Sequence, residues 1–263
     1  MDKNITDNEL FQELMPLFLS FIKSERYSVT LGGSHGKSVS DSRSDYDFRV
    51  YSDEFVKGDR WSRASDELNK KVSELKDKGI LVDDTWFRSI GDTDDIIRQW
   101  VSGGGAPIPF VWCVWGYHML TDIFNQLIID DSFGIAFKWK EELSIYPAKL
   151  QSAVIAKHSA SMKYWRNDYH FKSKVERADY VFLSSLTVRL IHDIFQVIYA
   201  LNRCYYPGDG NNMLYVKDFL ILPIDFEKRI VDVLYPNNAN TDMFMKQYSK
   251  LISLIDDTLL LCA

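Results

Sequence analysis

The chain has few cysteines, and their spacing does not suit a metal site. Only three cysteines occur among 263 residues, Cys113, Cys204 and Cys262, and no Cys-x-x-Cys pair is present. Small secreted domains use dense disulfide frameworks, and structural zinc sites use closely spaced cysteine pairs. The scattered pattern argues against both and favours free thiols in a reducing compartment.

An excess of positive charge is also missing. Lysine and arginine number 31 against 37 aspartate and glutamate residues, which gives a formal net charge of -6. Proteins that hold long nucleic acids neutralise the phosphates with clustered basic side chains. We therefore expect no long nucleic acid as a partner. A small phosphorylated ligand stays compatible with an acidic chain, because a local site can be positive or filled by a metal.

No basic leader and no long apolar run is present near the start. Residues 1–8 carry Asp2, Lys3 and Asp7 before any apolar stretch, unlike the basic start of a secretory signal. The apolar stretch 10–22 is interrupted by polar residues and a proline, and it is shorter than the roughly 20 residues needed to span a bilayer. We expect a cytoplasmic protein with no membrane partner.

The pattern of apolar residues predicts an α/β (α+β) fold in two domains. Alternating or β-branched residues predict strands at 27–31, 45–51, 80–87 and 127–134. Helical spacing predicts helices at 10–22, 53–78, 149–168, 175–202, 225–234 and 241–261, the first capped by Thr6 or Asp7. We therefore expect a small mixed sheet within residues 1–145 and a helical bundle within residues 146–263.

The stretch from Leu31 to Ser38, Leu-Gly-Gly-Ser-His-Gly-Lys-Ser, admits two interpretations. A phosphate-binding P-loop needs a glycine five positions before its Gly-Lys-Ser, and Leu31 stands there. A P-loop also leads directly into a helix, whereas this polar run leads to a new strand at Asp45. The segment 80–84 does imitate the second strand of a P-loop protein. The P-loop interpretation is disfavoured but stays open.

The second interpretation adds the acids that follow. Asp45 and Asp47 alternate along one strand, so both carboxylates point to the same face above the Gly-Ser turn. Converging carboxylates with room for substrate phosphates suit Mg²⁺, and the turn offers backbone N–H groups and a hydroxyl to those phosphates. An acid of the Asp83-Asp84 pair would complete a two-metal site for nucleotidyl transfer.

Residues 29–51 resemble the DNA polymerase β-like nucleotidyltransferase superfamily. The likeness rests on an apolar strand, the Gly32-Gly33-Ser34 turn, a short connection and Asp45-x-Asp47. Within the superfamily the chain looks most like bacterial small-molecule nucleotidyltransferases, including lincosamide and aminoglycoside adenylyltransferases. A weaker likeness covers residues 200–208. The resemblance implies a nucleotidyltransferase domain followed by a helical domain.

The resemblance also implies roles for individual residues. Gly33 and Ser34 hold the triphosphate of the nucleotide, and Asp45 and Asp47 ligate the metal ions. The third metal carboxylate is Asp83 or Asp84, and the doubled acid leaves the choice open.

Several further contacts are expected. Lys37 is the first candidate for a phosphate contact, with Arg43 and Arg49 as alternatives, and His35 is either a ligand contact or an exposed loop residue. The resemblance to antibiotic-modifying enzymes also implies a general base from the helical domain, where Glu176 and Asp179 are expected to begin a long helix and to share one face. Both acids also suit a solvated helix start, where the macrodipole favours negative charge.

The implied reaction is the Mg²⁺-dependent transfer of a nucleoside monophosphate to a hydroxyl group of a small molecule, with pyrophosphate leaving. Two metal ions and ATP as the donor are expected, and an aminoglycoside or lincosamide antibiotic is one acceptor class. Two alternatives stay open. One is nucleotidylation of a protein or a tRNA, as in toxin–antitoxin systems, and the other is a catalytically inactive nucleotide-binding module. The net acidity weighs against tRNA but not against a protein.

Overall fold

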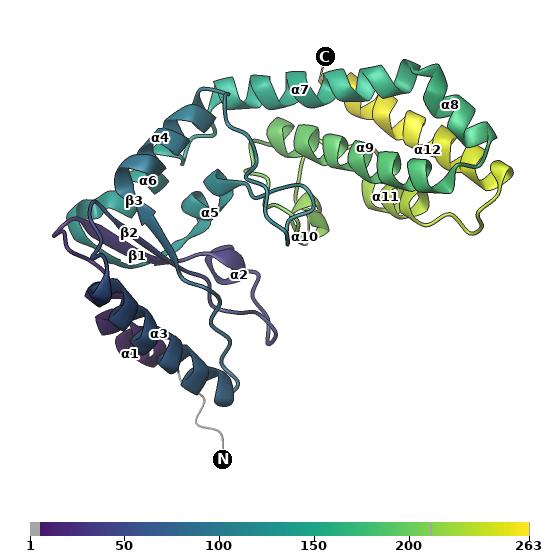
Figure 1. Cartoon of the computed structure of the whole chain (residues 1–263). Coiled ribbons are helices and arrows are strands. Elements are labelled where there is room, and N and C mark those ends of the chain that lie inside the picture. Colours follow the sequence, from purple (N-terminus) through teal and green to yellow (C-terminus); the bar gives the residue numbers. More distant parts are fainter. Residues whose placement is uncertain (1–5, 211, 263) are drawn as a thin grey trace. The chain divides into compact units, whose positions relative to one another are not determined.

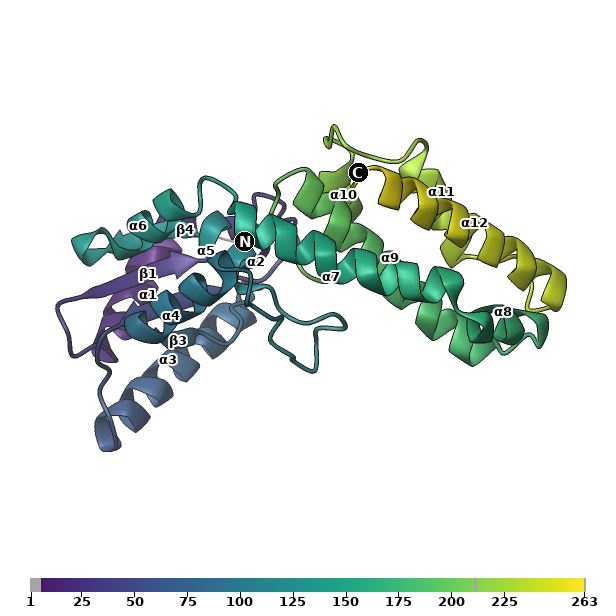
Figure 2. The same cartoon turned by 90° about the horizontal axis from the view of Figure 1, so that it is seen from above.

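The computed structural model describes residues 6–210 and 212–262, which form two compact units. The first unit contains residues 6–99 and 119–145, and the second contains residues 100–118 together with the described part of 146–262. Segment 100–118 therefore interrupts the first unit in sequence. Figures 1 and 2 show the elements of each unit in two views.

A small mixed sheet organises the first unit. Its strands are β1 (Tyr27–Leu31), β2 (Phe48–Ser52), β3 (Trp86–Ser89) and β4 (Leu127–Asp131), in the order β3-β2-β1-β4. β1 is antiparallel to both β2 and β4, and β2 is parallel to β3. This confirms the mixed α+β class. Because β1 and β2 are antiparallel, they do not form the parallel strand–helix–strand unit of a P-loop.

The two faces of the sheet have different chemistry because residues alternate along β1 and β2. Val29, Leu31, Phe48 and Val50 form one buried apolar face, with the helices α1 (Asp7–Ser20) and α3 (Asp59–Asp77) packed against it. Figure 1 shows these two helices on the same side of the sheet. The opposite face carries polar and charged residues, and it is the face that bears the candidate site.

Four short helices surround the sheet. α2 (Gly33–Gly36) is a single turn directly after β1, in a place where the sequence predicts only a polar loop. The others are α4 (Ile90–Val101), α5 (Met119–Asn125) and α6 (Ile135–Glu142), the last entered through the turn η1 (Ser132–Gly134). The predicted strand 80–87 is shorter than expected, since residue 82 makes only an isolated bridge to Tyr46 before β3 begins at 86.

The second unit is helical. Its helices are α7 (Ala148–Asn167), α8 (Tyr169–Glu176), α9 (Tyr180–Leu201), α10 (Asn212–Val216), α11 (Phe226–Leu234) and α12 (Thr241–Leu260). α7 and α9 lie side by side in both views, and α9 supplies much of the buried core. By length and composition alone α9 is apolar enough to cross a membrane, and 61% of its most apolar stretch is buried inside the structure.

The predicted helix 175–202 is wrong at its start. α8 ends at Glu176, Ala178 adopts a left-handed conformation with φ of 51°, and a new helix begins at Tyr180. Asp179 caps that helix, since its side chain accepts a hydrogen bond from the backbone N–H of Phe182. A residue with positive φ cannot continue a right-handed helix, so the chain turns there.

Three histidines of the second unit lie close together, His118 and His158 buried and His192 half-buried. The His118 and His192 rings lie 4.8 and 5.6 Å from the Tyr206 ring, and the His158 ring lies 5.6 Å from that of His192. Burial, reinforced by the neighbouring histidines, lowers the pKa of His118 to about 3 and that of His192 to about 4. Both side chains are therefore neutral near pH 7.

We expect these histidines to make the protein sensitive to acid. The pKa of an unfolded histidine, about 6.5, exceeds both folded values, so their stabilisation is present above pH 6.5 and is lost as the pH falls toward 4. At pH 4.5, His118 should lower the free energy of unfolding by about 3 kcal/mol. Urea denaturation at pH 7.0 and 4.5 should show a smaller loss for His118→Phe than for the wild type. His170→Phe, at a largely exposed ring, should match the wild type. Equal losses in all three proteins would contradict the assignment.

Candidate functional site

The Gly32-Gly33 turn lies directly against two carboxylates. The N–H of Gly32 donates to the carbonyl oxygen of Asp47 at 2.8 Å, which holds the turn beside the Asp-x-Asp segment. A Cβ atom on Gly32 would lie 2.5 Å from Oδ1 of Asp122, and one on Gly33 would overlap Oδ2 of Asp47. Gly33 also has a φ of 57°. Only glycine leaves room for both carboxylates at this turn.

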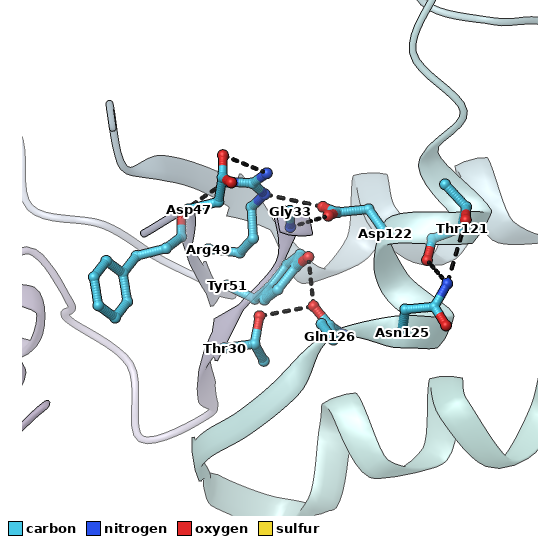
Figure 3. A network of polar contacts seen from close by, with 10 residues as sticks. Thr30, Gly33, Asp47, Arg49, Tyr51, Thr121, Asp122, Asn125 and Gln126 are labelled. Carbon is cyan, nitrogen blue, oxygen red and sulfur yellow. Dashed lines mark hydrogen bonds and ion pairs between the residues drawn. The ribbon is translucent and has the colours of Figure 1, made fainter. Parts of the chain in front are cut away.

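A buried network connects the turn to the second strand (Figure 3). Asp122 of α5 accepts a hydrogen bond from the Gly33 N–H through Oδ1 at 3.2 Å and one from Arg49 Nε through Oδ2 at 2.9 Å. Nη2 of Arg49 lies 3.4 Å from Oδ1 of Asp47. The side chains of Arg49 and Asp122 are 4% and 2% exposed, so water screens this pair very little.

Asp47 sits in an environment that resists its negative charge. Burial raises the pKa of its carboxyl to about 6, against the opposing effect of the Arg49 guanidinium. The charges of Asp45, Asp122 and Asp83 raise that pKa further. A carboxylate that is desolvated and faces other carboxylates gains from an added cation. The electrostatics therefore favour cation binding at Asp47.

The structure distinguishes between the two acids at the start of the β3 segment. The backbone N–H of Asp83 donates to the carbonyl oxygen of Tyr46 at 3.1 Å, which places Asp83 beside the Asp45-x-Asp47 segment. Both acids are exposed, but the charge of Asp83 raises the pKa of Asp47, as the smallest of several contributions, whereas Asp84 is not among the groups that shift it. Asp83 is therefore the acid that the fold brings toward the predicted pair.

The side chains of the turn keep unused hydrogen-bonding capacity. Oγ of Ser34 and Nε2 of His35 are buried atoms with no hydrogen-bond partner within residues 6–210 and 212–262. The His35 ring stacks on Tyr46 with ring centroids 4.3 Å apart, so this half-buried histidine is not a solvated loop residue. Lys37 ends α2, where its backbone N–H donates to the carbonyl oxygen of Gly33. The Ser34 hydroxyl is thus a buried polar group whose hydrogen-bonding capacity no described residue uses.

The other predicted contacts lie in different surroundings. Arg43 is exposed in the turn after α2, and Arg49 is engaged by Asp47 and Asp122 rather than open to solvent. Glu176 and Asp179 belong to the second unit and do not begin one helix, because Glu176 is the exposed last residue of α8. The role of Glu176 as a general base stays a prediction.

Within the described residues no set of three or more His, Cys, Asp or Glu side chains lies close enough together to hold a metal by itself. Mg²⁺ does not require such a set, since it is usually bound by one or two carboxylates together with substrate phosphates and water. Asp45 and Asp47, beside a glycine turn that admits close approach, are a donor set of this kind. The residues therefore fit a Mg²⁺ ion that arrives with a nucleotide.

Two polar residues near the end of α5 were not predicted from the sequence. Asp122 forms the network above, and Oε1 of Gln126 accepts hydrogen bonds from the hydroxyls of Thr30 and Tyr51 at 2.7 and 3.1 Å. The sequence did contain one signal for Asp122, since it is a single acid within the largely apolar segment 119–124. An acid in such a segment indicates a buried carboxylate, and a buried charge requires a partner.

Comparison with known proteins gives one family match. A family described as a domain of unknown function (DUF4037) matches residues 112–210, which is less than half of the chain. The matched stretch includes Asp122 but neither the glycine turn nor the Asp-x-Asp segment. No curated protein matches the chain.

Proposed function

We propose that the first unit is a Mg²⁺-dependent nucleotidyltransferase domain, followed by a helical-bundle domain, and that it transfers a nucleoside monophosphate to a hydroxyl group of a small molecule. One observation carries the proposal. The Gly32-Gly33-Ser34 turn contacts the carboxylate of Asp47, and further acids surround that carboxylate. A metal–triphosphate ligand needs a turn that binds its phosphates and a carboxylate that binds its metal ion, and the two must lie in direct contact.

The residues divide the binding between them. Ser34, with its unpartnered hydroxyl, would bind a phosphate oxygen of the donor, whereas the N–H groups of Gly32 and Gly33 already donate to Asp47 and Asp122. Gly33 would serve by letting the phosphates approach closely, since it has no side chain. Asp45 and Asp47, with Asp83 as the third acid, would hold two Mg²⁺ ions. Lys37 remains the proposed additional phosphate contact. ATP is the proposed donor because the resemblance is to adenylyltransferases.

The reaction forms one bond and breaks another at the same phosphorus atom. The oxygen of the acceptor hydroxyl bonds to the α-phosphorus, the bond from that phosphorus to the bridging oxygen breaks, and pyrophosphate leaves. The hydroxyl proton passes to a general base, for which Glu176 is the candidate. Bound Mg²⁺ would offset the negative charge of the phosphates during the transfer. The chain itself positions the donor against the acceptor.

The proposal is tested by calorimetric binding of each of the four ribonucleoside triphosphates, with and without Mg²⁺. We expect Mg²⁺-dependent binding of at least one of them to the wild type and a loss of at least about 100-fold in the Asp45→Asn/Asp47→Asn variant, since these carboxylates would hold the metal. Asp92→Asn/Asp95→Asn, at two exposed acids of α4, is the matched control and should bind like the wild type.

The variant should remain folded, because burial already disfavours the charged form of Asp47 and asparagine removes that charge. Pyrophosphate release in the presence of a hydroxyl acceptor separates an enzyme from a nucleotide-binding module. Tight binding without release from any acceptor would support the inactive module. Failure of the wild type to bind any of the four triphosphates would refute the donor site.

A further inference from the structure

Asp122 is a charged residue in a place that packing alone does not explain. It lies on the short helix α5, among the buried residues Leu120, Thr121 and Ile123, and it is 2% exposed. Burying a carboxylate is unfavourable, and replacing a buried ion pair by apolar side chains is often neutral or stabilising. A residue needed only to fill this volume would therefore be apolar.

The two oxygens of Asp122 contact two different parts of the candidate site. Oδ1 accepts from the Gly33 N–H of the turn, and Oδ2 accepts from Nε of Arg49 on β2 (Figure 3). Both bonds have ordinary hydrogen-bond lengths, 3.2 and 2.9 Å. Since the turn and β2 are separate segments, the carboxylate fixes the position of one relative to the other.

Arg49 extends this connection to Asp47. Its Nη2 atom lies 3.4 Å from Oδ1 of Asp47, and its guanidinium also lies over the Trp86 ring, 4.6 Å from the centroid. With Nε held by Asp122 and the planar group resting on Trp86, the guanidinium has little freedom to turn. Arg49 therefore holds one oxygen of Asp47 from within the protein, and the Oδ2 oxygen lies against Gly33.

We propose that Asp122 is a positioning residue that, through Arg49, holds the carboxylate of Asp47 in register with the phosphate-binding turn. This inference rests on the proposed function, because the turn and Asp47 are taken as the phosphate and metal contacts. Residues that hydrogen-bond to metal-binding side chains fix the orientation of those side chains. Mutating such residues typically lowers metal affinity about 10–100-fold. Asp122 acts through Arg49 and Gly33 and does not itself contact the ligand.

The test is a double-mutant cycle read by calorimetric binding of Mg²⁺–ATP. Asp122→Asn and Arg49→Lys should each weaken binding about 10-fold or more. Asparagine weakens the contact with the guanidinium, and the ammonium group of lysine lacks the planar set of N–H donors with which Arg49 contacts both carboxylates. The double variant should bind no more weakly than the worse single variant, since both changes break the same connection. Asp131→Asn is the matched control. That carboxylate also accepts backbone N–H groups, at the start of α6, and its variant should bind within about two-fold of the wild type because it does not touch the network.

A second variant covers the case in which Asp122→Asn does not fold. Gly32→Ala keeps every charge but introduces a Cβ atom 2.5 Å from Oδ1 of Asp122, which must displace that carboxylate. It should weaken Mg²⁺–ATP binding in the same direction. Two results would refute the positioning role of Asp122 and leave the proposed function standing. One is wild-type binding of Mg²⁺–ATP in both Asp122→Asn and Gly32→Ala. The other is additive effects of Asp122→Asn and Arg49→Lys in the cycle. Absence of Mg²⁺–ATP binding in the wild type would overturn the proposed donor and this inference together.

Discussion

Gly33→Ala is expected to lower the free energy of unfolding by about 2–5 kcal/mol and to abolish Mg²⁺-dependent nucleotide binding. A positive φ is strained by about 1–2 kcal/mol for a residue with a Cβ atom, and the overlap of that atom with Asp47 adds about 1–3 kcal/mol. Binding should fail because the methyl group displaces the carboxylate that we assign to the metal. Chemical denaturation and calorimetry of the same preparation measure both effects.

The first unit offers a matched control at Gly58. That residue also has a positive φ, 60° with a ψ of −137°, in a region of backbone conformation that favours glycine, but a Cβ atom there would meet nothing within 4 Å. Gly58→Ala should therefore show the backbone strain alone and should leave nucleotide binding unchanged. Adding Asp47→Ala to Gly33→Ala should recover part of the lost stability, because it removes the overlapping oxygen. Equal stability losses for the two glycine variants would show that overlap with the Asp47 carboxylate does not contribute to the loss in Gly33→Ala.

Arg49→Met is expected to destabilise the protein by about 3–5 kcal/mol near pH 7, because it removes the guanidinium that pairs with the buried carboxylate of Asp122 and that also contacts Asp47. The comparison is Arg26→Met, which removes an ion pair with Asp53 on the same sheet. The two side chains of that pair are 52% and 36% exposed, so its loss should change stability by about 1 kcal/mol or less.

Replacing both members of the buried pair should reverse most of this effect. Arg49→Met/Asp122→Leu removes both charges of the pair, and apolar side chains of similar size fill the space. Asp47 loses its contact with Arg49 in the single and the double variant alike, so this loss cancels in the comparison. Urea denaturation of the single and double variants measures the coupling between the two positions. A double variant that is as unstable as Arg49→Met would mean that packing against Trp86, and not the charge of Asp122, accounts for the loss.

The parts of the fold that depend on local chemistry could be predicted from the sequence. Thr6 caps α1 in a reciprocal capping box with Glu9, as the residue types at the start of that helix indicate. The β-branched segment 27–31 coincides with β1. The break between α8 and α9 was missed because apolar residues on both sides keep helical spacing. The capping preference of Asp179 was the one local signal of a new helix start.

The candidate site was predictable only where its residues are close in sequence. The predicted strand starts too early, since β2 begins at Phe48 and the Asp45-x-Asp47 segment lies just before it. The glycine turn follows β1, and Leu31 pairs with Phe48, so the pairing of two consecutive strands brings the turn and the acids together. Asp122 lies 89 positions from Gly33 and 73 from Arg49, and neither its spacing nor its neighbours indicate those partners. The fold decides this contact, since α5 must pack on the polar face of the sheet.

Segment 100–118 determines which fragments of the protein can be complete and in what order the two units can fold during synthesis. The chain passes from one unit to the other after residues 99, 118 and 145, so no single cut yields both units complete. A fragment ending at 145 would carry Trp115 without the His192 ring against which it packs, 4.6 Å between centroids. During synthesis on the ribosome the same segment emerges before its packing partners exist. The strands of the sheet, including β4, are then complete, whereas the buried residues of 113–118 can pack only after the helices of the second unit have been made.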